Sequence, residues 1–357
     1  MIATAAQLEA ARLTQHFLDA GAAPVSADIL QPAGTLLDLY GEDIRARAYT
    51  THDPLRGEQM LRPDFTVPVV QMHMTHGADP ARYTYQGRVF RQQTDPARAT
   101  EYLQVGYELF ARDDPAAADA EVFALINDAL SHLNLTPVTG DIGILMAAVL
   151  GLATTDRRKN ALLRHIWRPA RFRQLLNRFS GRTPAPETRV ALLEQSDPMA
   201  HDFPHIGLRS AAEVSARIDA LREDSATPPI TGDEVQLIDA ILSIRDTAPM
   251  ALANLKALTS DIPTMAPAVT RLAGRIDALA VRGINVDTLQ FETDFGRTLL
   301  EYYDGFVFGF RADPAAAPIA TGGRYDALTR QLGQGAAIPA VGGVIRPGLI
   351  VDLEGAS

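Results

Sequence analysis

The sequence of 357 residues contains no cysteine, which excludes disulfide bonds and metal sites built from thiolates. It also lacks any run of about 18 apolar residues, so we expect no membrane-spanning segment. Near the start of the chain, Glu9, Arg12 and Asp19 interrupt the apolar core that a secretory signal peptide would need. Together these absences predict a cytoplasmic protein that makes no contact with a membrane.

The chain also has no excess of positive charge. It contains 33 lysines and arginines and 43 aspartates and glutamates, which gives a formal net charge of -10. A surface of that sign repels phosphate backbones, which disfavours a general nucleic-acid-binding protein. One segment departs from this average and carries eight basic residues: Arg157, Arg158, Lys159, Arg164, Arg168, Arg171, Arg173 and Arg178. Acidic residues follow that could neutralise it, namely Glu194, Glu213, Asp219, Glu223 and Asp224. We therefore predict a solvated or protein-contacting face and expect no tRNA partner.

The eight histidines are scattered along the chain. His73 and His76 have a spacing that could place both on one metal ion, but a surface pair beside a turn is the favoured interpretation. We predict no metal site and no cofactor.

Hydrophobic residues make up 46% of the chain and charged residues 21%, as in soluble globular proteins. Hydrophobic periodicity and turn signals divide the sequence into segments of helical and of strand character. Helices are expected at 5–21, 34–39, 116–133 and over most of 155–282, and strands at 82–90, 103–110, 138–142, 289–295 and 302–310. This order predicts an α+β fold, in which residues 1–152 and 284–357 form one sheet-based domain and residues 153–283 an inserted helical module.

Three motifs in the first half of the chain carry polar groups suited to a ligand. LRPDFTVPV places Asp64 and Thr66 where an extended segment becomes a helix, so an acid and a hydroxyl could meet a ligand ammonium. YQGRVFRQQ ends a predicted strand with Arg91, and arginine suits bidentate capture of a carboxylate or phosphate. QVGYELF sets Gln104 and Glu108 on one face of a strand, as in the floor of a pocket.

Two further motifs lie near the end of the chain. EYYDGFVFGF contributes Tyr302 and Tyr303, and TGGRYDAL contributes a glycine pair followed by Arg324 and Tyr325. Glycine allows the backbone to approach a ligand closely, and tyrosine offers a flat wall with a polar tip. Taken singly, each of these residues could equally belong to an ordinary polar strand face, a helix cap or the core, and Tyr302 is expected in the core.

In chain order, the five motifs resemble the class II aminoacyl-tRNA synthetase core, and specifically histidyl-tRNA synthetase. LRPDFT is similar to that family's LRPEGT, and the next two motifs are similar to its motif 2 hairpin. EYYDGFVFGF and TGGRYDAL are similar to its histidine-recognition motifs. The resemblance covers both sheet-based parts and is thin over the helical insertion. It implies a class II synthetase-like antiparallel sheet flanked by helices, and a histidine pocket lined by Asp64, Thr66, Arg91, Gln104, Glu108, Tyr303 and Tyr325.

The chain departs from this family where the synthetases bind ATP. Thr298 stands where they have an arginine that stabilises charge during adenylation, and Leu349 replaces the arginine that holds the γ-phosphate. Arg297 is adjacent, but on a strand a shift of one residue points a side chain to the opposite face. The sequence also ends a few residues after Leu349, so we expect no anticodon-binding domain. Loss of such charges lowers rates by about 10²-fold or more per group, which implies that synthetase activity is lost.

A histidine pocket without the ATP-binding arginines resembles the regulatory subunit of short-form ATP phosphoribosyltransferase. That resemblance implies a non-catalytic homodimer within a hetero-oligomer, which partners the short catalytic subunit, binds L-histidine and relays feedback to the first step of histidine biosynthesis. No catalytic residue is expected. Two alternatives stay open: a divergent enzyme that still activates histidine with Arg297 or Arg346 in place of the missing arginines, and a synthetase-like protein that contacts tRNA.

Overall fold

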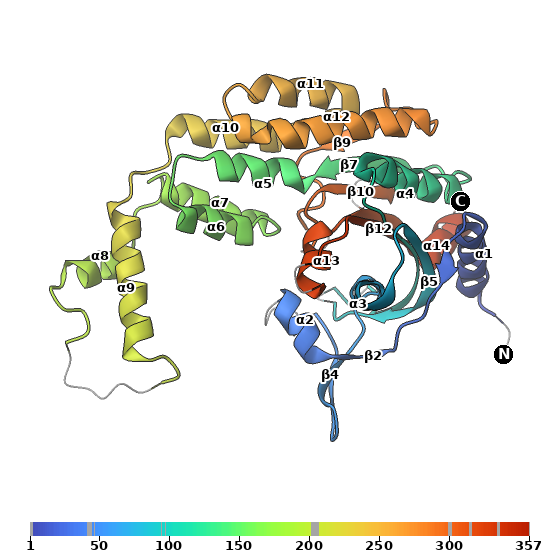
Figure 1. Cartoon of the computed structure of the whole chain (residues 1–357), viewed down its shortest axis with the longest axis horizontal. Helices are drawn as coiled ribbons and strands as arrows, with labels where there is room; N and C mark the ends of the chain where they lie inside the picture. Colours follow the sequence, from blue (N-terminus) through green and yellow to red (C-terminus); the bar gives the residue numbers. More distant parts are fainter. Residues whose placement is uncertain are drawn as a thin grey trace.

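A mixed nine-stranded sheet forms the centre of the protein, whose structure is a computed structural model (Figure 1). It describes residues 3–40, 45, 47–93, 95–96, 98–200, 207–298, 302–313, 316–333 and 336–356. The strand order is β1-β5-β6-β12-β11-β10-β7-β9-β8. Its strands are β1 (Ala23–Pro24), β5 (Ala81–Phe90), β6 (Glu101–Phe110), β12 (Ala340–Ile345), β11 (Ala320–Arg324), β10 (Phe306–Arg311), β7 (Thr136–Asp141), β9 (Gln290–Glu292) and β8 (Arg245–Thr247).

Most neighbouring strands of this sheet run antiparallel, and only the pairs β1/β5 and β7/β9 are parallel. The longest pair is β5 with β6, which are in register from Ala81 beside Phe110 to Phe90 beside Glu101. Helices cover both faces of the sheet (Figure 1). The predicted α+β class is therefore confirmed.

A second, three-stranded sheet lies below the main one in Figure 1 and consists of β2 (Leu30–Pro32), β4 (Gly57–Leu61) and β3 (Thr50–Asp53). Helix α2 (Ala33–Tyr40) follows β2 directly, in agreement with the helix expected at 34–39. The β3–β4 hairpin projects from the body of the molecule, and Leu55 near its tip is 93% exposed.

The outer face of the sheet is covered by α1 (Ala5–Asp19), α4 (Pro115–Ala129) and α14 (Pro347–Ala356) (Figure 1). Leu13 and Phe17 of α1 are fully buried there because the helix turns its one apolar face to the sheet. Phe123 of α4 packs against a row of phenylalanines that alternate along β10: Phe306, Phe308 and Phe310.

The inner face of the sheet curves around α3 (Thr66–His76), which contacts α13 (Asp326–Leu332) (Figure 1). This enclosure corrects the surface position expected for His73. The side chain is only 4% exposed, and its ring stacks on Phe110 with 3.8 Å between centroids. Burial lowers the pKa of His73, because the charged imidazolium loses its hydration. The described residues include no group of three or more potential metal ligands.

Residues 142–281 are mainly helical. Their helices are α5 (Ile142–Gly151), α6 (Asp156–Arg164), α7 (Pro169–Phe179), α8 (Glu187–Glu194), α9 (Ala211–Ala226), α10 (Gly232–Ser243), α11 (Ala248–Leu258), the short 3-10 helix Pro263–Met265 and α12 (Ala266–Val281). Two elements of this segment join the core, because β8 pairs with β9 at the sheet edge and α12 packs on α4. In contrast, α8 and α9 form an arm that extends away from the sheet (Figure 1). The division into a core domain and an inserted module stays a prediction.

Acidic side chains of α9 pair with three of the eight basic residues of this segment. Arg158 is buried between α6 and α9, where its Nε donates to Asp224 Oδ1 over 2.7 Å and its other nitrogens donate to backbone carbonyls. Arg157 pairs with Glu223, and Arg178 pairs with Asp224. Two of the acids that were expected to neutralise the basic segment therefore do so. No helix in the described part of the chain is long and apolar enough to cross a membrane.

The strands near the end of the chain are shorter than the sequence indicates. β9 ends at Glu292, and β10 begins only at Phe306, so residues 293–298 form turns. Arg297 lies in this turn, so the strand alternation used to predict its direction does not apply to it. Gly296 has a φ of +91°, a conformation that glycine adopts without strain, and this turn lets the chain reverse over Val307.

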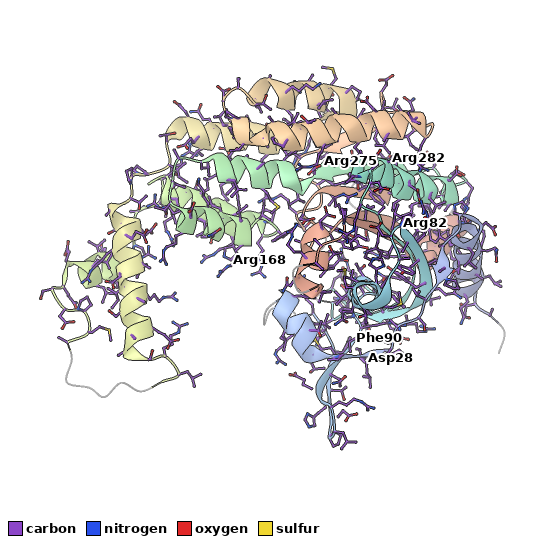
Figure 2. All side chains as sticks on the ribbon, in the orientation of Figure 1. Asp28, Arg82, Phe90, Arg168, Arg275 and Arg282 are labelled. Atoms are coloured by element: carbon purple, nitrogen blue, oxygen red, sulfur yellow. The ribbon has the colours of Figure 1, made fainter. Side chains whose placement is uncertain are left out.

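A buried ionic cluster joins four elements of the fold: α4, α12, β11 and β7. Asp119 of α4 accepts hydrogen bonds from Arg275 of α12 at 2.9 Å and from Arg324 of β11 at 2.6 Å. Arg275 also donates to Asp141, the last residue of β7, at 2.8 Å. Figure 2 shows Arg275 where α12 passes over α4. Because all four residues are at most 7% exposed, each charge depends on its partners for compensation.

We predict that Asp119→Asn lowers the free energy of unfolding by about 3 kcal/mol, since it leaves two buried guanidinium groups short of a counter-charge. Urea denaturation measures the difference. Asp128→Asn, at an exposed position on the same helix, is the matched control and should change stability by less than about 0.5 kcal/mol. Equal stabilities of the two variants would show that the cluster does not hold the fold together.

Candidate functional site

A small cavity lies on the inner face of the sheet, where β6, β12 and β11 meet the start of α3. Alternation along β6 directs Gln104 and Glu108 to this face. Its lining residues come from segments distant in the sequence: Asp64, Thr66, Arg91, Gln104, Glu108, Tyr302, Tyr303, Tyr325, Gly342, Gly343 and Val344. All seven residues predicted from the motifs are brought together here.

Glu108 is the centre of the cavity and is only 1% exposed. Its Oε1 accepts hydrogen bonds from Thr66 Oγ1 and Tyr85 Oη, both at 2.9 Å. Its Oε2 accepts a hydrogen bond of 2.5 Å from Tyr325 Oη. Burial raises the pKa of Glu108 to about 7, although the three hydroxyl donors act in the opposite direction because they favour the ionised form.

Glycines on β6 and on the neighbouring β12 make room for these polar groups. Gly342 of β12 lies opposite Glu108, and a Cβ atom there would be 1.5 Å from Glu108 Oε2. Gly106 in the same way accommodates the ring of Tyr85. Any larger residue at either position would push a cavity side chain aside, so these two glycines determine how the carboxylate and its hydroxyl donor can be placed.

Asp64 is the second buried carboxylate of the cavity, at 4% exposure. Burial raises its pKa, and the positive charge of Arg91 opposes this effect. Arg91 itself is oriented by the carbonyl oxygen of Pro63, which accepts a 2.7 Å hydrogen bond from its Nε. Two buried acids beside one guanidinium give the cavity an excess of hydrogen-bond acceptors, which favours a ligand that carries several N–H donors.

Gln104 has no hydrogen-bond partner among the described residues, either for its Nε2 or for its Oε1. Its side chain is fully buried and lines the cavity. A buried amide without a partner costs about 1–3 kcal/mol, which makes it a candidate contact for a ligand or a water molecule. The cavity volume is about 10 Å³, enough for about one water molecule. A larger ligand can enter only if some of the lining side chains move.

Two further hydroxyl donors lie at the cavity. Tyr302 belongs to the core, as expected, and its side chain also lines the cavity, where its hydroxyl donates to Thr66 Oγ1 at 3.3 Å. Tyr85 was not identified as a site residue at all. The sequence feature that could have identified Tyr85 is Gly106. The two residues pair across β5 and β6, and the aromatic ring of Tyr85 can lie across a glycine, which has no side chain.

Two arginines from the motifs have positions outside the cavity. Arg88 forms a surface ion pair with Glu101 at 3.1 Å, and Arg324 belongs to the buried cluster around Asp119. Arg297 is buried as well, but its Nε donates to the carbonyl oxygen of Ile166 at 2.8 Å, and its guanidinium lies over the ring of Phe172. Arg297 therefore fastens the turn between α6 and α7 to the core and does not reach the cavity.

The positions of the two missing synthetase arginines lie away from the cavity. Thr298 lines a separate hollow of about 260 Å³ with Glu292, Asp294 and Arg311. Leu349 is half-buried in α14 and packs against the hydrophobic core. Neither position supplies positive charge to the Glu108 cavity.

The family model for histidyl-tRNA synthetase matches residues 3–223 and 216–347 of the chain. The ATP phosphoribosyltransferase regulatory subunit of Brucella anthropi is 33% identical over 343 residues, which cover 89% of each chain. That of Brucella ovis is 34% identical over 346 residues, again covering 89% of each chain. The chain belongs to the ATP phosphoribosyltransferase regulatory subunits, within the histidyl-tRNA synthetase-like family.

Solved structures agree with the class II synthetase-like fold. An ATP phosphoribosyltransferase regulatory subunit/histidyl-tRNA synthetase from Bacillus halodurans superimposes with a TM-score of 0.69 at 19% identity, covering 98% of this chain and 79% of that one. A histidine–tRNA ligase subunit from Alicyclobacillus acidocaldarius gives a TM-score of 0.62 at 24% identity, with coverage of 99% and 93%. At these identities the likeness concerns the fold alone.

We predict that Glu108 makes the stability of the protein fall as the pH rises from about 4.5 to about 7. The raised pKa means that the folded state keeps its proton over this range while the unfolded state has lost it. The stabilisation is therefore complete below the unfolded pKa and is lost as the pH passes through the folded pKa. Urea denaturation across this range should show a steeper decline for the wild type than for Glu108→Gln. Parallel curves would contradict the assignment.

Proposed function

We propose that the chain serves ATP phosphoribosyltransferase as its regulatory, non-catalytic subunit in histidine biosynthesis, and that it binds L-histidine in the Glu108 cavity. The observation that carries the ligand assignment is the combination of two buried carboxylates with the unpartnered amide of Gln104. Such a set of buried acceptors is suited to a small ligand rich in N–H groups. Family membership supports the regulatory role.

Histidine matches the polar groups in number and sign. Its imidazole N–H can replace a hydroxyl donor at Glu108, and the ring can lie between the walls formed by Tyr303 and Tyr325. The ammonium group then meets Asp64 with Thr66, and the carboxylate meets Arg91. Gln104 is left to contact the amino-acid backbone atoms, which would satisfy its buried amide.

The closed state of the cavity supports a sensing role. A volume of about 10 Å³ does not hold an amino acid, so binding requires the hydroxyls around Glu108 to be displaced. Histidine then stabilises a different arrangement of α3 and of the segment that carries Tyr303, because it binds only that arrangement. A ligand with different affinities for two states shifts their equilibrium, and this is the physical requirement for feedback.

The contacts of Tyr303 connect the cavity to the helical segment, so that a movement of one can displace the other. Trp167, in the turn between α6 and α7, donates its indole N–H to the carbonyl oxygen of Tyr303 over 3.1 Å. Arg297 fastens the same turn through Ile166. A displacement of Tyr303 on ligand binding would therefore reach α6 and α7.

We further propose a short-form catalytic subunit as the partner, a homodimer of this chain inside the hetero-oligomer, and a cytoplasmic location. tRNA binding is not part of the proposal, because Arg157, Arg158 and Arg178 of the basic segment are engaged with Glu223 and Asp224. A divergent histidine-activating enzyme is the alternative. It would need Arg297 or Arg346 at the reacting phosphate. Arg297 is held by Ile166 and Phe172, and Arg346 donates to the carbonyl oxygen of Pro318 at 3.1 Å.

We predict that Glu108→Gln weakens L-histidine binding about 10- to 100-fold, since a hydrogen bond to a charged group contributes about 1.5–3 kcal/mol. Isothermal titration calorimetry on the full chain measures the affinity. Glu101→Gln, at the exposed end of the same strand, is the matched control and should bind as the wild type does. Equal loss in both variants, or none in Glu108→Gln, would rule out this cavity as the histidine site.

We also predict that the chain alone gives no histidine-dependent exchange of pyrophosphate into ATP. When mixed with the short catalytic subunit, it should raise phosphoribosyltransferase activity, and L-histidine should lower the activity of the mixture. The physical reason is that no cation occupies the Thr298 and Leu349 positions to stabilise the charge that develops on the phosphates. Exchange above background would support the histidine-activating alternative instead.

A further inference from the structure

A second hollow, of about 260 Å³, lies where the turn after β9 crosses the sheet to β10, and it plays no part in the proposed histidine site. The Glu108 cavity measures only about 10 Å³, whereas this hollow can hold a small organic molecule as it stands. We call it the β10 hollow. Its lining residues come from β9, the turn, β10 and the loop after β10: Glu292, Asp294, Phe295, Gly296, Thr298, Gly309, Arg311, Ala316 and Pro318.

Glycines bring the turn close to the sheet and shape one wall of the β10 hollow. A Cβ atom on Gly140 of β7 would be 2.8 Å from the carbonyl oxygen of Glu292, and one on Gly309 would be 2.8 Å from Cζ of Phe295. The ring of Phe295 therefore lies directly over the backbone of Gly309. The guanidinium of Arg311 lies 5.9 Å from the centre of the same ring. A ring with a guanidinium beside it is a surface on which a flat heterocycle can stack.

Two half-buried carboxylates supply hydrogen-bond acceptors to the β10 hollow. Glu292 Oε1 accepts a hydrogen bond from Arg311 Nη2 at 2.8 Å, and Asp294 Oδ2 accepts one from Arg245 Nη2 at 2.6 Å. Among the described residues, no donor reaches the second oxygen of either carboxylate. Each acid therefore keeps one oxygen that can accept a hydrogen bond from an O–H or N–H group of a ligand.

The charges around the β10 hollow disfavour an ionic ligand. Each carboxylate is compensated by one arginine, so neither sign is in excess to attract a phosphate, an ammonium group or a metal ion. The hollow therefore suits an uncharged molecule that has a flat ring and several hydroxyl donors, which is the chemistry of a nucleoside. Bases stack on aromatic rings, and acidic side chains accept hydrogen bonds from ribose hydroxyls.

We propose that the β10 hollow binds a nucleoside, with the base against Phe295 and Arg311 and the ribose hydroxyls on Glu292 and Asp294. This inference goes beyond histidine sensing and does not depend on it, because the hollow shares no lining residue with the Glu108 cavity. The turn that forms the wall also carries Arg297, whose Nε donates to the carbonyl oxygen of Ile166. A bound nucleoside therefore contacts the turn that connects the core to α6 and α7.

The test titrates adenosine, guanosine, cytidine and uridine into the full chain by calorimetry. Asp294→Asn replaces a charged acceptor and should weaken the nucleoside that binds about tenfold. Asp287→Asn, at an exposed position outside the hollow, is the matched control and should bind as the wild type does. Thr298→Trp fills the hollow from an exposed position and should abolish binding, whereas Thr298→Ser should retain it.

The 5′-monophosphate of the same nucleoside should bind more weakly, since both arginines at the hollow are engaged by carboxylates. Four results would each overturn the proposal: no binding of any of the four nucleosides, equal binding by Asp294→Asn and Asp287→Asn, binding by Thr298→Trp, or tighter binding of the monophosphate. Displacement of the nucleoside by L-histidine would place it in the Glu108 cavity and overturn the proposal as well. Thermal unfolding checks the fold of each variant, and if Thr298→Trp is unfolded, the comparison of Asp294→Asn with Asp287→Asn decides.

Discussion

The buried charge of Asp119 is the constraint on which the rest of the structure depends. Two arginines compensate it, and they come from positions more than 150 residues away along the chain on α12 and β11. Because a buried carboxylate cannot remain ionised without such partners, the helical segment and the sheet must close together. Tyr325 directly follows Arg324 and reaches Glu108, so the same cluster also places one wall of the cavity.

The cavity contains a second set of buried polar and charged groups. The hydrogen-bond partners of these groups are incomplete. Glu108 is held by three hydroxyls and has a raised pKa, while Gln104 lacks partners. Groups of this kind reduce stability unless a ligand satisfies them, which is the usual relation between stability and function at binding sites. The fold tolerates the deficit because the glycine-lined strands and the ionic cluster around it are well packed.

The loss of synthetase chemistry has a structural counterpart in this arrangement. The proposed amino-acid pocket keeps all seven residues that the motifs predict, whereas the positions of the two synthetase arginines are occupied by a threonine beside another hollow and by a leucine that packs against the core. Arg297 instead connects the core to the turn between α6 and α7, through its hydrogen bond to the carbonyl oxygen of Ile166. The presence of these pocket residues without the synthetase arginines agrees with the role in sensing an amino acid that we propose.

The sequence by itself determined the α+β class, most helices, the long hairpin and all seven residues gathered at the cavity, because local periodicity and motif order are properties of neighbouring residues. Only the tertiary structure decided which way Arg297 points, that His73 is buried and that Tyr302 lines the cavity. These depend on where a strand stops and on what packs against it. Pairing between distant strands fixes both, and no single segment encodes that pairing.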